Sequence, residues 1–281
     1  MTENNRGAAA NEDTAVTELS QILTLLEAFA FSVDLAYAVE PAASSQFQED
    51  ESASAPFQIG QFVGYCLLQA ADAARSISRV ARDGEGNLNL PIISMYPLAR
   101  GLIECAATAI WAMSPADQRS RVLRRLQFAA DELSHDAKLY KSMAIAFPPS
   151  QAQDILRATT QKRRDARAAL RRIADAHEIA LDQFENSCPG WETIVQLAGD
   201  QIPQMMTGAL PSMWRLASGL SHPSSSRGRD TLDFTEIRET DGVLSGTYSV
   251  RVSNIAGVLA MAEWASRHAL ELWIGSKNPQ P

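Results

Sequence analysis

The stretch PIISMYPLARGLIECAATAIWAM, residues 91–113, is apolar on almost every side when it is wound as an α-helix. A helix that is apolar all round is either buried in a protein core or inserted in a membrane. Arg100 and Glu104 lie in the middle of this stretch, and charged side chains are costly at that depth of a bilayer. The stretch therefore predicts a central, buried helix of a soluble protein, around which the other helices pack.

Helical spacing of apolar residues recurs along most of the remaining chain. We expect helices at about residues 14–39, 57–82, 115–146, 150–179, 191–198, 203–220 and 253–274. Between residues 229 and 252, two segments rich in β-branched and aromatic residues flank Asp241-Gly242, which predicts one β-hairpin. The fold class expected is therefore all-α, a bundle-like arrangement of about seven helices with one small β-hairpin before the C-terminal helix.

Three segments lack this periodicity. Residues 1–13 contain no apolar run, so we expect a disordered tail and not a signal peptide. Residues 40–56 contain proline, several serines and an acidic run, and we expect a mobile surface loop there. Residues 276–281 are expected to form a second tail. A single helical domain then spans residues 14–275.

Composition and charge narrow the functional classes. The 281 residues carry a net charge of −8, with a pI near 5.1, which argues against a protein that covers nucleic acid or an anionic membrane with its whole surface. Cys66, Cys105 and Cys188 show no C-x-x-C spacing, so we expect neither a disulfide framework nor a zinc-thiolate site, and a cytoplasmic location fits best. P-loop, dinucleotide-binding, α/β-hydrolase and zincin motifs are absent from the sequence, and we expect no cofactor.

The first candidate site is formed by Arg215, Ser218 and His222. A separation of seven residues is about two helical turns, so these side chains are expected on one face near a helix end. A guanidinium binds phosphate bidentately, and an imidazole that titrates near neutral pH can move a proton to or from an oxygen. The alternative is structural: Arg215 and His222 cap a helix end and hydrogen-bond a loop.

The spacing Arg215-x6-His222 resembles the R-x4–6-H motif of the HEPN superfamily of helical, nucleotide-associated proteins. The resemblance implies a metal-independent endoribonuclease that acts as a homodimer on RNA, as a toxin or phage-defence component. It implies that His222 is a general acid or base, that Arg215 binds the scissile phosphate and that Ser218 orients one of them. It does not identify an antitoxin or other protein partner. His177 also satisfies the motif, through Arg171 and Arg172.

A second resemblance is to a group of uncharacterised bacterial helical proteins with R-x3-E, a downstream Trp and Arg, and a late S-x3-H. The matching residues are Arg100, Glu104, Trp111, Arg119, Ser218 and His222. The resemblance implies that the first four support the site or line a pocket beside it. The alternative for Arg100 and Glu104 is a structural ion pair, joined by Arg119 or Arg163, and the cost of burying unpaired charges favours it.

The sequence also contains part of a metal-ligand pattern. Glu104, together with Glu132 and His135 in a Glu-x-x-His pattern, has half of the ligand set of a ferritin-like di-iron centre. The chain has no second Glu-x-x-His, so the sequence favours the absence of a metal.

A basic segment, residues 162–172, either follows an RNA backbone or is a solvated helix surface, and the second is the commoner meaning of such a segment. No aromatic residue interrupts it. The alternative function for the whole chain is a non-catalytic helical protein that binds a partner or a small ligand in a cleft beside the central helix.

Overall fold

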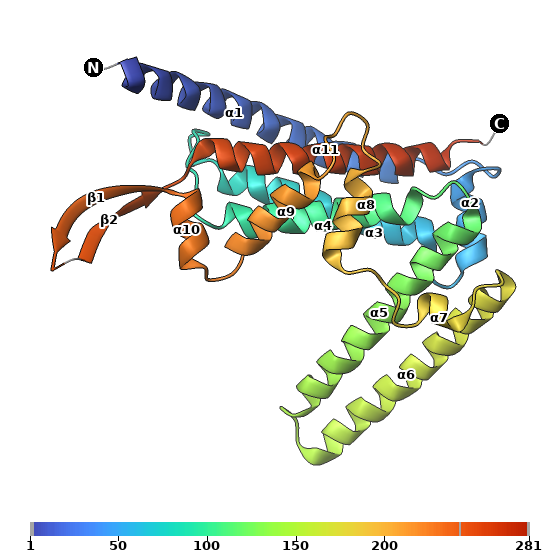
Figure 1. Cartoon of the computed structure of the whole chain (residues 1–281). Coiled ribbons are helices and arrows are strands. Elements are labelled where there is room, and N and C mark those ends of the chain that lie inside the picture. Colours follow the sequence, from blue (N-terminus) through green and yellow to red (C-terminus); the bar gives the residue numbers. More distant parts are fainter. Residues whose placement is uncertain (1–2, 242, 280–281) are drawn as a thin grey trace. The chain divides into compact units, whose positions relative to one another are not determined.

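The computed structural model describes residues 3–241 and 243–279, and most of them are helical (Figure 1). It confirms the all-α fold class with one small β-hairpin before the C-terminal helix. The described residues form 11 helices where about seven were expected. Three of them are short and lie outside the ranges expected to be helical: α2 (Gln46–Ser54), α7 (Leu181–Phe184) and α10 (Ser225–Thr231).

The chain divides into two compact units. Unit 1 comprises Met1–Glu40, Gly64–Ile110 and Trp191–Ile274, and unit 2 comprises Pro41–Val63, Trp111–Gly190 and Gly275–Pro281. Each of α3 (Ile59–Val80), α4 (Met95–Met113) and α11 (Val252–Lys277) contributes residues to both units. The expectation of one domain over residues 14–275 stays a prediction.

In unit 1, α4 is the buried helix that its apolar sequence predicts. Its largest fully buried side chains there are Met95, Tyr96, Leu102 and Ile103. α1 (Glu3–Tyr37) and α3 also supply core residues. Ion pairs join Arg75 of α3 to Asp34 of α1, and Arg82, two residues after α3, to Glu27 of α1. α8 (Trp191–Gly199) contacts α9 (Ala209–Leu220), which in turn contacts α10.

The N-terminal helix is longer than expected. It begins at Glu3, so residues 3–13 are helical where a tail was expected, while residues 1 and 2 lie outside the described residues. By length and composition alone, the part Glu12–Tyr37 is long and apolar enough to cross a membrane. A single such helix near an N-terminus is weak evidence for a membrane protein, because core helices of soluble proteins meet the same criterion.

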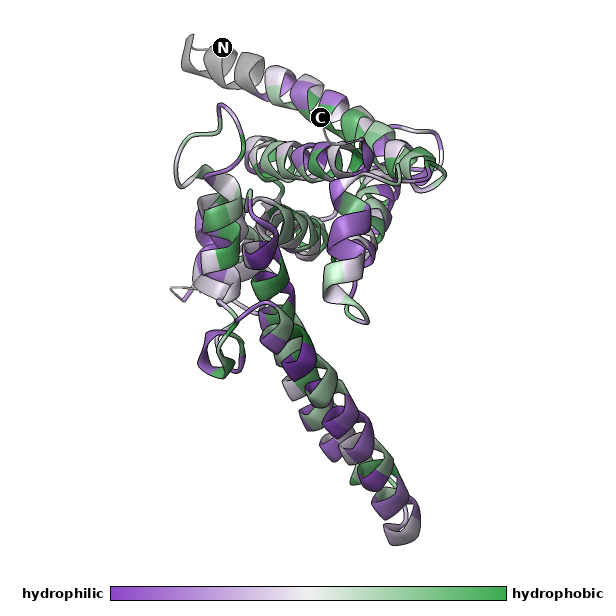
Figure 2. Cartoon of the chain, turned by 90° about the vertical axis from the view of Figure 1, so that its right-hand side faces the viewer, coloured by the Kyte–Doolittle hydropathy of each residue, from purple (hydrophilic) through white to green (hydrophobic). Residues whose placement is uncertain are grey.

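In unit 2, the helices α5 (Gln118–Ala144) and α6 (Pro149–Ala176) pack against each other. Hydrophilic and hydrophobic residues alternate along both helices, as expected for a two-helix pair that is solvated on its outer sides (Figure 2). α7 and α2 also contact α5. The expectation of a mobile loop over residues 40–56 was wrong: Ser45 caps α2 by accepting a hydrogen bond from the backbone N–H of Gln48, and α2 packs on α5.

The hairpin is formed by β1 (Asp233–Thr240) and β2 (Val243–Ser249), which pair antiparallel with Asp233 opposite Ser249. The register shifts between Glu236 and Arg238. The expected turn includes Gly242, which lies outside the described residues. α11 ends at Lys277, two residues into the segment expected to be a tail, and residues 280–281 also lie outside the described residues.

Candidate functional site

The candidate site begins with an ion pair on α4, within unit 1. Arg100 and Glu104 are four residues apart and therefore lie on the same side of the helix. The Nε of Arg100 lies 2.8 Å from Oε1 of Glu104, and the two side chains are 26% and 16% exposed. The ion pair considered from sequence is thus present, and water screens it less than it would screen a fully exposed pair.

A tryptophan of α9 binds the same carboxylate. The indole Nε1 of Trp214 donates a hydrogen bond of 2.9 Å to Oε1 of Glu104. One carboxylate oxygen therefore accepts from a guanidinium of its own helix and from an indole of another helix. An oxygen that accepts two hydrogen bonds limits the directions in which the Arg100 guanidinium can point.

His222 lies two residues beyond the end of α9 and is exposed. Its Nε2 is 3.4 Å from Nη1 of Arg100. A guanidinium can only donate hydrogen bonds, so this contact requires Nε2 to be the acceptor and the proton of the neutral ring to be on Nδ1. The imidazole therefore places Nε2 beside a cation at the protein surface.

The structure does not give His222 the neighbour that its motif suggests. The guanidinium of Arg215 forms an ion pair with Glu192, at the start of α8, and both side chains are more than half exposed. Ser218 is half-buried, and within the described residues its hydroxyl makes no hydrogen bond to Arg215 or His222. The residue next to the imidazole is thus Arg100 and not Arg215.

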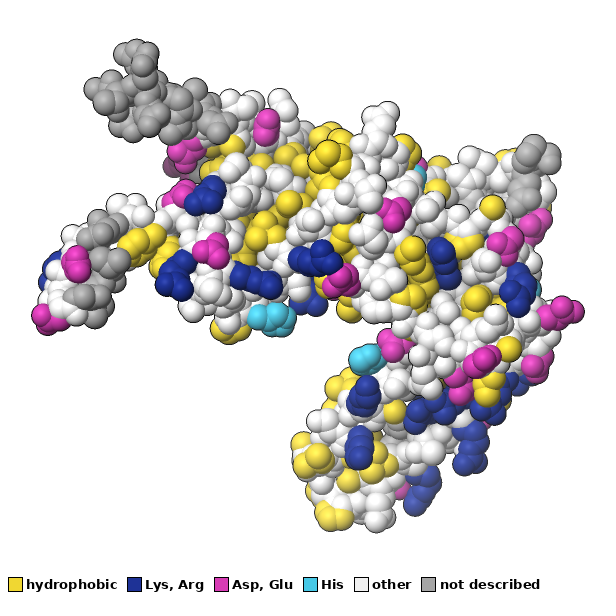
Figure 3. Space-filling view, in the orientation of Figure 1, with side chains coloured by type: hydrophobic (Ala, Val, Ile, Leu, Met, Phe, Trp, Pro, Cys, Tyr) yellow, Lys and Arg dark blue, Asp and Glu magenta, His cyan; other side chains and the backbone are white. Residues whose placement is uncertain are grey.

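A further arginine crosses the end of α9. Nη1 of Arg227, from α10, donates a hydrogen bond of 3.3 Å to the backbone oxygen of Arg215. It lies against Gly219, where an added Cβ would be 1.5 Å from the same Nη1. Only glycine therefore leaves room for this side chain. Lys and Arg side chains gather on this face over α9 and α10, together with a histidine (Figure 3).

Two supporting residues expected from sequence have structural roles in unit 2. Trp111 is 2% exposed, and the guanidinium of Arg124 lies 5.4 Å from its ring centre. Arg119 donates hydrogen bonds of 3.0 and 2.9 Å to the backbone oxygens of His177 and Glu178, just after α6. Neither is among the residues that bind the Arg100 and Glu104 pair.

The second histidine that satisfies the motif has a different environment. Nε2 of His177 is 3.1 Å from the backbone oxygen of Ala53, and the side chain is partly buried. A histidine tied to a backbone carbonyl has a structural role. His222, by contrast, is exposed and touches a charged side chain, so the structure separates two histidines that the sequence motif treats alike.

The three residues that the sequence offers as metal ligands contact other side chains. Glu132 pairs with Arg125 at 3.2 Å, His135 lies 3.5 Å from Asp131, and Glu104 is bonded as described above. Within residues 3–241 and 243–279, no three or more His, Cys, Asp or Glu side chains are grouped as metal ligands.

Sequence reasoning missed Trp214, Arg227 and Glu192. The signal for Arg227 is the glycine at position 219, because a glycine within a helical pattern often marks a close approach of another group. A half-buried Trp usually finds an acceptor for its N–H, but the sequence does not show that Glu104 is the acceptor. No protein-family model, curated protein or solved structure matches this chain.

Proposed function

We propose that the chain is a metal-independent endoribonuclease in which His222 transfers protons and Arg100 binds the scissile phosphate. The observation that supports this proposal best is the exposed imidazole of His222, with Nε2 3.4 Å from Nη1 of Arg100. Glu104 is a positioning residue, because it holds the Arg100 guanidinium, and Trp214 acts through its hydrogen bond to Glu104. The resemblance of Arg215-x6-His222 to the HEPN motif points to the same reaction.

In this reaction the ribose 2′-oxygen attacks phosphorus and the bond between phosphorus and the 5′-oxygen breaks. The products are a 2′,3′-cyclic phosphate and a 5′-hydroxyl. Neutral His222 accepts the proton of the 2′-hydroxyl at Nε2, and the Arg100 guanidinium stabilises the charge on the non-bridging oxygens. A separation of 3.4 Å exceeds the usual limit of about 3.2 Å for such a hydrogen bond, so the imidazole exchanges this partner for a substrate proton at little cost.

The 5′-oxygen needs a second group to protonate it as it leaves. We propose that a protonated His222 of a second copy supplies this proton, which makes the homodimer part of the active unit. Arg215 and Arg227 are exposed on the same unit and are assigned to binding the adjacent phosphates.

A cytoplasmic location is part of the proposal. None of the described cysteines Cys66, Cys105 and Cys188 forms a disulfide, which fits a reducing compartment. A toxin or phage-defence role rests on the sequence resemblance alone.

The test is cleavage of a mixed RNA pool in excess EDTA by the wild type, His222→Ala, Arg100→Ala and Arg100→Lys. Loss of a general acid or base costs about 10²- to 10⁴-fold in rate, so His222→Ala should lose at least that much. Arg100→Lys should recover part of the activity that Arg100→Ala loses. The matched control is His135→Ala, which removes an exposed histidine of unit 2 and should leave the rate unchanged.

Each alternative outcome decides against the proposal. Cleavage that survives in His222→Ala would point to a contaminating nuclease or to a different site. Absence of cleavage by the wild type at high protein concentration would favour the non-catalytic alternative, in which unit 1 binds a partner or small ligand. Dependence of cleavage on an added divalent metal would contradict the metal-independent mechanism.

A further inference from the structure

A second charged surface lies in unit 2, along one side of α6. This helix carries seven Lys or Arg residues and three Asp residues, a net charge of +4 in a chain whose net charge is −8. Five of its arginines line a shallow groove of about 520 Å³, together with Thr160 and Ala168. The surface is called the α6 arginine face below and comprises Arg163, Arg164, Arg167, Arg171 and Arg172.

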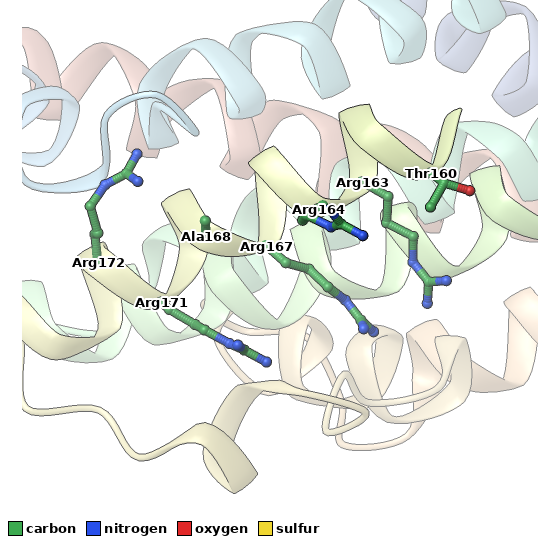
Figure 4. A pocket seen from close by; sticks show the side chains of 7 residues that line it. All are labelled: Thr160, Arg163, Arg164, Arg167, Ala168, Arg171 and Arg172. Atoms are coloured by element: carbon green, nitrogen blue, oxygen red, sulfur yellow. The ribbon is translucent and has the colours of Figure 1, made fainter. Parts of the chain in front are cut away.

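The arginines of this face are regularly spaced. Arg163, Arg167 and Arg171 follow one another at intervals of four residues, about 6 Å along the helix axis. Figure 4 shows these three side chains extending to the same side of α6. Like charges at this spacing destabilise a helix by about 0.2–0.5 kcal/mol per pair unless a counter-charge is present. The ladder of three cations is therefore unfavourable in the free protein.

The chain itself provides few acidic partners for this face. Arg171 lies 3.5 Å from Glu185, and no ion pair is recorded for Arg163, Arg164, Arg167 or Arg172 within residues 3–241 and 243–279. The Nε of Arg163 is buried and has no hydrogen-bond acceptor among the described residues. A buried donor without an acceptor costs free energy. Arg163 also lines the groove, where the rest of its guanidinium can meet an oxyanion.

We propose that the α6 arginine face binds double-stranded nucleic acid through its phosphate backbone. Arginine pairs bidentately with phosphate, and a straight ladder of guanidinium groups can neutralise several phosphates along one strand. The groove has no aromatic side chain on which unpaired bases could stack, so a duplex is favoured over a single strand. Contacts to phosphate do not read the base sequence.

Other anionic partners fit the face less well. The groove has no large apolar side chain that could insert into a membrane or serve as an anchor for a protein partner. Five of its seven lining residues are arginines. This inference concerns binding in unit 2 and does not depend on cleavage at His222 in unit 1.

The test measures the binding of the full-length protein to a labelled DNA duplex by fluorescence anisotropy as a function of salt. A DNA duplex lacks the 2′-hydroxyl and is not a substrate of the proposed nuclease. Contact of each of the five arginines with one phosphate predicts a slope of log K against log salt of about −4.5, or a loss of about 500-fold in affinity between 50 and 200 mM salt. An RNA duplex should bind similarly, and a single strand of the same sequence more weakly.

The decisive variant replaces Arg163, Arg167 and Arg171 together with alanine. It should reduce the slope to about −1.8, or about twelvefold over the same salt range, because the contacts of Arg164 and Arg172 remain. The triple lysine variant should keep most of the binding. Alanine favours helix, so circular dichroism should show that the fold is retained. The matched control is Arg157→Ala, which removes an exposed α6 arginine outside the groove, already paired with Asp154.

Three outcomes would overturn the proposal. The first is an unchanged slope in the triple alanine variant, and the second is an absence of duplex binding by the wild type at 50 mM salt. The third is equal or tighter binding to vesicles of phosphatidylcholine and phosphatidylserine or to polyglutamate. His222→Ala should bind the duplex like the wild type, so failure of the nuclease proposal and failure of this one can be distinguished.

Discussion

Replacement of Arg121 with alanine tests what orders α2 within unit 2. Nε and Nη2 of Arg121 donate hydrogen bonds of 2.7 and 2.9 Å to the two carboxylate oxygens of Asp50 on α2. Nη1 donates to the backbone oxygens of Pro115 and Ala116, just before α5. The two charged side chains are 4% and 3% exposed, so both charges of this bidentate pair are removed from water.

The cost of Arg121→Ala follows from this burial. Without the guanidinium, the Asp50 carboxylate stays buried with only a long contact of 3.4 Å from Gln46, and two backbone oxygens lose their donors. Removal of one partner of a buried ion pair typically costs about 3–5 kcal/mol. The unfolding equilibrium of the region should therefore shift by about a hundredfold to several thousandfold.

Hydrogen exchange of the full-length protein, followed in peptides that cover α2, measures this loss of stability locally. Arg121→Ala should strongly reduce protection across α2, and urea unfolding should report the loss of stability. The double variant Asp50→Leu with Arg121→Met should recover most of the loss, because no charge stays buried. Arg157→Ala, in an exposed pair of α6, should change nothing measurable. Unchanged protection of α2 in Arg121→Ala, with less than about 1 kcal/mol lost, would refute the reasoning.

Three further predictions concern single residues. Gly219→Ala places a methyl group against Arg227, whose flexible side chain can move away, so the free energy of unfolding should change by less than about 1 kcal/mol. RNA cleavage should nevertheless fall as far as in Arg227→Ala. Normal cleavage by Gly219→Ala would exclude Arg227 from the site. The backbone N–H of Ser120 lowers the pKa of Asp117, the cap of α5, below its ordinary 3.8. The stability that the ionised Asp117 carboxylate contributes is therefore fully present above pH 3.8 and is lost as the pH falls through the pKa of the folded protein. Asp117→Asn should thus lose less stability on acidification than the wild type, as measured by urea midpoints. An equal loss in both proteins would contradict this. Burial, and secondarily the charge of Glu104, raises the pKa of the Cys105 thiol to about 11. Glu104→Gln should lower that pKa and speed alkylation of Cys105 by iodoacetamide, as followed by peptide mass spectrometry, and an unchanged rate would mean that the charge of Glu104 does not reach the thiol.

The sequence predicts the helices and strands that are stabilised by their own apolar pattern. α4 is recognisable because its residues are apolar on all sides, and the structure buries Tyr96 and Leu102 fully. The hairpin is recognisable from β-branched and aromatic residues on both sides of a turn. In both cases the local pattern and the packing favour the same conformation.

The short helix α2 could not be predicted in this way. Its sequence, QFQEDESAS, is mostly polar and contains an acidic run that is typical of a solvated loop. What orders it is Asp50, whose charge is matched by Arg121, 71 residues further along the chain. A pairing over such a distance leaves no periodic signal, and a charge that reads as exposed in the sequence is in fact buried.

The same reasoning explains why the structure sets His222 beside an arginine other than the one in the motif. Helix geometry correctly places Arg215 and His222 near one end of α9, but it fixes only the position of each Cα and Cβ. The long Arg215 side chain ends at Glu192 on α8, while Arg100 reaches His222 from α4, 122 residues away. RNA cleavage by the variants Arg215→Ala and Arg100→Ala tests which of the two arginines acts with His222. If the geometry is the better guide, Arg100→Ala should lose far more activity, and the reverse order would restore the role that the motif gives to Arg215.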